Sequence, residues 1–167
     1  MNHRHKIILL VEDNPDDIAL TRRALERNDF AGEVIVAHDG AEALDYLFAA
    51  GAYHGRDTSM MPKVVLLDLK LPKLDGLEVL SRIRNDERTK NLPVVILSMS
   101  NEEKDIWRCY RLGANSYIRK PVDFIQFSAA MQQFGRYWLQ LNEAPPKMSW
   151  QEAASSLEIG AGVCTKN

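Results

Sequence analysis

Four short apolar segments each end in a polar or charged side chain suited to chemistry. The segments KIILLVED, KVVLLD, PVVILS and NSYIRKP end with Glu12 and Asp13, Asp68, Ser98, and Lys120. Apolar runs of this length are typical of strands that are buried on both faces, as in a parallel sheet. Because the carboxyl ends of parallel strands meet at one edge, we expect these side chains to share one crevice.

The rest of the chain alternates between strand-like and helix-like segments. Asn14 and Pro15 form a typical helix start, Asp39 is suited to cap a second helix, and residues 52–62 have the composition of an exposed loop. The pattern predicts an α/β fold with a doubly wound, five-stranded parallel sheet in the order 2-1-3-4-5. The expected strands are 6–11, 33–37, 64–68, 94–98 and 116–118, and the helices that follow them end near 28, 51, 86, 112 and 141.

Composition and length fit one globular domain. We expect it to span residues 1–142, and residues 143–167 to form a C-terminal extension without an output domain. A net charge of −2 gives no general attraction to nucleic acid. The absence of a membrane-length apolar stretch and of a signal-peptide pattern predicts a cytoplasmic protein. The two cysteines, Cys109 and Cys164, are interpreted as unpaired thiols.

The predicted crevice has the groups needed to handle a phosphoryl group. Its carboxylates would repel one another unless a hard cation such as Mg²⁺ neutralised them, and Glu12 and Asp13 are the candidates to hold it. Asp68 could then act as the nucleophile, while Lys120 and Ser98 contact the phosphoryl oxygens. Taken singly, each residue has an ordinary explanation as a cap or a surface group, but their joint placement at strand ends favours the functional one. Pro121, next to Lys120, can also form a cis peptide bond.

Four motifs, LLVEDNPDD, LLDLKLPKLDG, ILSMS and YIRKPVD, resemble the receiver domain of two-component response regulators, which has a flavodoxin-like fold. The resemblance extends over residues 6–141. It implies that Asp68 is the phosphoacceptor, that Glu12 and Asp13 are the acidic metal pair, and that Lys70 gives the metal a backbone carbonyl ligand. It also implies that Ser98 is the switch hydroxyl, Tyr117 the switch aromatic and Lys120 the phosphate-binding lysine.

A narrower resemblance concerns partners. The long segment before the third strand and the ending FGRYWLQLNEAPP are similar to single-domain regulators that are paired with phytochrome histidine kinases. We therefore expect a histidine kinase as the phosphodonor. We also expect either a downstream phosphotransfer protein or a homodimer formed by the tail and the region of Phe134, Tyr137 and Trp138.

Two positions depart from the usual pattern. Lys70 stands two residues after the acceptor, where a short residue is common, and Met99 follows Ser98 in place of a small residue. Both bear on the lifetime of a phosphoryl group. Lys70 also argues against the main alternative, an aspartate-nucleophile phosphatase, because such enzymes place a second aspartate there as general acid. A phosphorylation-independent scaffold and a flavin carrier are further alternatives.

Overall fold

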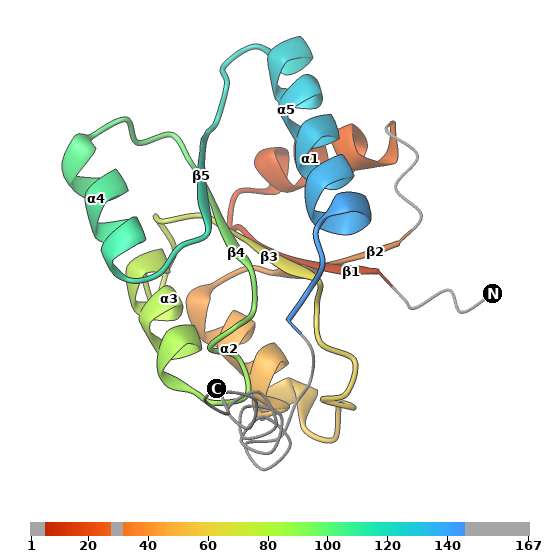
Figure 1. The fold of residues 1–167 in the computed structure, drawn as a ribbon, viewed down its shortest axis with the longest axis vertical. Helices are drawn as coiled ribbons and strands as arrows, with labels where there is room; N and C mark the ends of the chain where they lie inside the picture. Colours follow the sequence, from red (N-terminus) through yellow and green to blue (C-terminus); the bar gives the residue numbers. More distant parts are fainter. Residues whose placement is uncertain (1–5, 28–31, 146–167) are drawn as a thin grey trace, which may run out of the picture.

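The computed structural model describes residues 6–27 and 32–145 of the chain. Figure 1 shows a central sheet with helices packed on both of its faces. All strands are parallel, in the order β2-β1-β3-β4-β5, which confirms the predicted fold and strand order. The strands are β1 (Ile7–Val11), β2 (Glu33–Ala37), β3 (Val64–Leu67), β4 (Val94–Ser98) and β5 (Ser116–Arg119).

The two helical layers bury opposite sides of the same strands. Helices α1 (Pro15–Glu26) and α5 (Phe124–Arg136) cover one face, and α2 (Gly40–Phe48), α3 (Gly76–Asn85) and α4 (Glu103–Arg111) cover the other. In β1, for example, Ile8 and Leu10 belong to the first core, whereas Leu9 and Val11 belong to the second. Because successive side chains point to opposite faces, a strand between two helical layers must be apolar throughout.

Side-chain caps begin four of the helices at the carboxyl edge of the sheet. Asn14 accepts hydrogen bonds from the backbone N–H groups of Asp16 and Asp17, and Asp39 accepts one at the start of α2, as predicted. Asp75 and Asp123 cap α3 and α5 in the same way. The caps satisfy backbone donors that would otherwise lack partners.

The long segment between α2 and β3 is organised by one arginine. It begins with a short 3-10 turn, η1 (Gly51–Tyr53). The Arg56 guanidinium then donates to the carbonyl oxygen of Tyr46 at 2.7 Å and to that of Met60 at 3.0 Å, and it lies 4.2 Å from the centre of the Tyr46 ring. These contacts tie the loop to the end of α2.

The end of α5 differs from the prediction that the sequence spacing makes, which is an apolar stripe of Phe124, Phe127, Met131, Phe134, Trp138 and Leu141. The helix continues into a π-helical turn, η2 (Tyr137–Leu141). A π turn contains an extra residue, so the side chains after it rotate relative to the helix. Leu139 is therefore buried in place of Leu141, which is exposed. Phe134 also lies in the core, so Tyr137 supplies more of the exposed aromatic surface here.

Other expectations concern the thiols, membranes and the extension. Cys109 is a free, buried thiol, and burial raises its pKa to about 11. Among residues 6–27 and 32–145, no helix has both the length and the apolar character needed to cross a bilayer. Cys164 and residues 146–167 of the expected extension lie outside the described residues.

Candidate functional site

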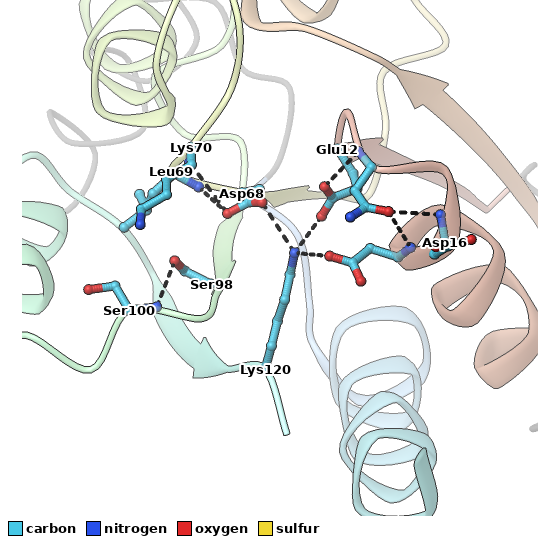
Figure 2. Close-up of polar contacts among 10 residues, drawn as sticks. Glu12, Asp16, Asp68, Leu69, Lys70, Ser98, Ser100 and Lys120 are labelled. Atoms are coloured by element: carbon cyan, nitrogen blue, oxygen red, sulfur yellow. Dashed lines mark hydrogen bonds and ion pairs between the residues drawn. The ribbon is translucent and has the colours of Figure 1, made fainter. Parts of the chain in front are cut away.

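The predicted site residues meet at the carboxyl edge of the sheet. Glu12 and Asp13 follow β1, Asp68 follows β3, Ser98 is the last residue of β4, and Lys120 follows β5. Parallel register between neighbouring strands brings these ends together. In Figure 2 the Lys120 side chain extends from β5 toward the group formed by Asp68 and Glu12.

Lys120 is the electrostatic centre of the site. Its Nζ lies 2.5 Å from Glu12 Oε2, 2.9 Å from Asp17 Oδ2 and 3.2 Å from Asp68 Oδ2. An ammonium group carries three N–H donors, and here each has a carboxylate acceptor. The peptide bond between Lys120 and Pro121 is trans, although a proline at this position can also be cis.

Burial makes this ion cluster sensitive to the loss of any member. The side chain of Glu12 is 2% exposed and that of Lys120 is 6% exposed. Burial raises the pKa of Glu12, and the hydrogen bond from Lys120 opposes this effect only in part. Burial alone would lower the pKa of Lys120, but its bonds to Glu12 and Asp17 and the charge of Asp68 hold that pKa above its usual value. Lys120 therefore stays charged and partly neutralises three carboxylates.

Three acidic side chains are placed to hold a metal ion. One oxygen from each of Glu12, Asp13 and Asp68 lies within 4.8 Å of the others. Carboxylate oxygens are the ligands that hard divalent cations prefer, so the donor set fits Mg²⁺ or Mn²⁺. Asp68 is oriented by backbone N–H groups that donate to its Oδ1, from Leu69 at 2.7 Å and from Lys70 at 3.4 Å. Lys70 thus lies beside Asp68, and its side chain is exposed.

Ser98 and Tyr117 are linked through Ser100. Buried Ser98 accepts a hydrogen bond on its Oγ from the backbone N–H of Ser100 at 3.2 Å, and the Tyr117 hydroxyl donates to the Ser100 carbonyl oxygen at 2.9 Å. The Ser100 hydroxyl donates to Asp105 in α4 at 2.7 Å. These hydrogen bonds connect Ser98 with Asp105 in α4 and with Tyr117 in β5. Met99, between the two serines, is exposed.

Two further residues of the site were not identified from the sequence. Asp17 is an acid in the first turn of α1, and no sequence signal separates it from its neighbour Asp16. Gly76 permits the chain after Asp68 to fold back, since a Cβ atom there would lie 2.2 Å from the Asp68 carbonyl oxygen. The sequence signal for Gly76 is its place at the end of the motif LLDLKLPKLDG.

The chain is similar to a known protein family and to individual proteins of known sequence. Residues 8–132 match the family described as the response regulator receiver domain. The chain is 43% identical over 139 residues to the probable methanogenesis regulatory protein FilR2 of Methanothrix harundinacea, covering 83% of this chain and 87% of that protein. It is 36% identical over 140 residues to the response regulator Rcp1 of Synechocystis, covering 84% of this chain and 93% of that protein.

Solved structures give a consistent result. The phosphorylated cyanobacterial phytochrome response regulator RcpA is 41% identical, with a TM-score of 0.79 over 85% of this chain and 99% of that one. The bacteriophytochrome response regulator AtBRR is 53% identical, with a TM-score of 0.68 over 83% of this chain and 99% of that one. The Mn²⁺-bound form of Rcp1 is 35% identical, with a TM-score of 0.77 over 84% of this chain and 99% of that one.

Proposed function

Because the chain belongs to the response regulator receiver family, we propose that it is a two-component signalling protein that accepts a phosphoryl group on Asp68. The phosphodonor is a phosphohistidine of a histidine kinase. The observation that carries the assignment of Asp68 is its contact with Lys120 at 3.2 Å beside an acidic cluster suited to a metal. The family match does not favour the phosphatase or the scaffold alternative.

The transfer follows from the groups around Asp68. A carboxylate oxygen attacks phosphorus as the bond between phosphorus and the donor nitrogen breaks, and the imidazole leaves with that electron pair. Lys120 then donates to one phosphoryl oxygen and Ser98 to another. Mg²⁺ held by Glu12, Asp13, Asp68 and the backbone carbonyl of Lys70 would neutralise the charge that builds up on the phosphoryl oxygens. The Mn²⁺-bound form of Rcp1 supports a divalent ion in such a site.

The response to phosphorylation runs through Ser98 and Ser100. When Ser98 turns its hydroxyl toward the phosphoryl group, it gives up the bond from the Ser100 N–H that it accepts at 3.2 Å. Ser100 also holds the Tyr117 hydroxyl and Asp105, so its movement repositions Tyr117 and α4 together. The signal is thereby converted into a changed surface on α4, β5 and α5.

The partners follow from the relatives. The similarity to RcpA and AtBRR supports a phytochrome-type histidine kinase as the cognate donor. The output is a change in protein association in the cytoplasm, by docking on a phosphotransfer protein or by homodimerisation. A groove of about 440 Å³ between β5 and the end of α5, lined in part by Phe134, Tyr137 and Trp138, supports a contact surface in this region. The protein acts as a signalling module rather than as an enzyme on an external substrate.

Intact mass spectrometry tests the acceptor assignment. The protein is incubated with Mg²⁺ and a small acyl phosphate, and the wild type is compared with Asp68→Asn and with Asp16→Asn, which removes an acid that makes no contact with Lys120. We expect an adduct of about 80 Da on the wild type and on Asp16→Asn, and none on Asp68→Asn. Absence of the adduct on the wild type at saturating donor would favour the scaffold, and steady hydrolysis of phosphate esters would favour the phosphatase.

The dimer is tested separately by light scattering with and without beryllofluoride, a phosphoryl mimic. A Tyr137→Ser variant removes the exposed ring without changing the site at the other end of β5. We expect a dimer that this variant weakens. A wild-type protein that stays monomeric in both conditions would exclude homodimerisation as the output.

A further inference from the structure

We propose that Asp17 is the exchangeable partner of Lys120: it holds one N–H donor in the resting protein and releases that donor when a phosphoryl group arrives. The inference deepens the proposed function and rests on it. It concerns a residue outside the acidic metal cluster, since the three oxygens that lie within 4.8 Å of one another belong to Glu12, Asp13 and Asp68.

All three donors of Lys120 are engaged before phosphorylation. The contacts to Glu12 at 2.5 Å and Asp17 at 2.9 Å are shorter than the contact to Asp68 at 3.2 Å. The ammonium is therefore held more closely by the two carboxylates that do not accept the phosphoryl group. An additional bond to a phosphoryl oxygen requires Lys120 to give up an acceptor that it already has.

Burial identifies the acceptor that is released. Glu12 is 2% exposed, so water cannot replace Lys120 at the carboxylate oxygen that it contacts, and loss of that contact is costly even when a metal ion shares the carboxylate. Asp68 carries the phosphoryl group itself, so the contact with Asp68 keeps Lys120 beside the phosphoryl oxygens and is not the one that is released. Asp17 is 33% exposed, so water can solvate its carboxylate after Lys120 turns away.

This arrangement gives Asp17 a defined energetic role. Its attraction for Lys120 stabilises the unphosphorylated state and is lost on phosphorylation, so it opposes the binding of phosphoryl oxygens. Asp17 is a positioning residue, because it acts on the phosphoryl group only through Lys120. Removing its charge should favour the phosphorylated form and its mimics.

Asp16 provides a matched control for the test. Asp16 and Asp17 are both acids in the first turn of α1, and both backbone N–H groups donate to Asn14. Asp16→Asn and Asp17→Asn therefore make the same change in net charge and in the interaction with the helix dipole. They differ in that Asp17 contacts Lys120 and Asp16 does not.

The experiment measures the affinity of each variant for beryllofluoride at saturating Mg²⁺, with the Mg²⁺ affinity determined separately. We expect Asp17→Asn to bind beryllofluoride about threefold more tightly than Asp16→Asn. The factor is small because a partly exposed ion pair contributes little free energy. We expect the two variants to bind Mg²⁺ equally. Equal or weaker beryllofluoride binding by Asp17→Asn would overturn the inference, as would a gain matched by a change in Mg²⁺ affinity. A wild type that binds no beryllofluoride would instead overturn the proposed function.

Discussion

Replacement of Lys120 by methionine should destabilise the protein in a way that Mg²⁺ reverses. The variant keeps most of the packing of the lysine stem but leaves Glu12, which is 2% exposed, without a cation. Breaking a buried ion pair typically costs about 3 to 5 kcal/mol. Methionine fills the volume and Asp17 is partly hydrated, so we expect a loss near the lower end, about 3 kcal/mol at neutral pH. That loss is smaller than the usual stability of such a domain, about 5 to 15 kcal/mol, and the variant should fold.

Urea denaturation followed by circular dichroism measures this loss. The control is Lys104→Met, which breaks the ion pair with Glu102 between two exposed side chains and should leave stability unchanged. Because Lys120 and a metal ion neutralise the same carboxylates, saturating Mg²⁺ should stabilise Lys120→Met more than it stabilises the wild type. Equal stability of the Lys120 and Lys104 variants, or equal stabilisation of Lys120→Met and wild type by Mg²⁺, would refute this reasoning.

Two further predictions concern backbone space and pH. Gly76→Ala should destabilise the protein and weaken metal binding, because the added Cβ would lie 2.2 Å from a backbone oxygen. Gly135→Ala in α5, where the nearest neighbour of an added Cβ is at 3.9 Å, should instead stabilise the protein by about 0.5 to 1 kcal/mol. Thermal unfolding compares the two variants, and equal effects would contradict the argument. The hydrogen bonds from Arg88 lower the pKa of Asp86 to about 2, below its unfolded value. The pair should therefore contribute its stability, under about 1 kcal/mol, above pH 4 and lose it as the pH falls through about 2. A carboxyl NMR titration of Asp86 with a midpoint near 4 in the wild type would disprove this.

The sheet and most of the site were predictable because their signals are local. A strand between two helical layers must be apolar at every position, and β1, β3 and β4 are such runs. Parallel topology then fixes where their ends meet, so the grouping of Glu12, Asp68 and Lys120 follows from strand assignment alone. The caps at Asn14 and Asp39 have equally local signatures.

The missed features depend on contacts that no local pattern encodes. Asp17 and Lys120 are 103 positions apart, and only the folded structure selects Asp17 over its neighbour Asp16. Ser100, in the loop after β4, acquires its role because Tyr117 in β5 donates to its carbonyl oxygen. The π turn after α5 moves burial from Leu141 to Leu139 although the spacing of apolar residues continues unbroken. These features arise from packing between elements.

The central claim, that Asp68 is the phosphoacceptor, is tested most directly by locating the phosphoryl group on the chain. An aspartyl phosphate is an acyl phosphate, so borohydride reduces it to homoserine, and peptide mass spectrometry then identifies the position. The account predicts homoserine at residue 68 alone, and only when both Mg²⁺ and a phosphodonor were present. Homoserine at residue 13 or 17, the corresponding reduction product 5-hydroxynorvaline at Glu12, or a phosphoryl adduct that yields no homoserine at residue 68 would contradict it.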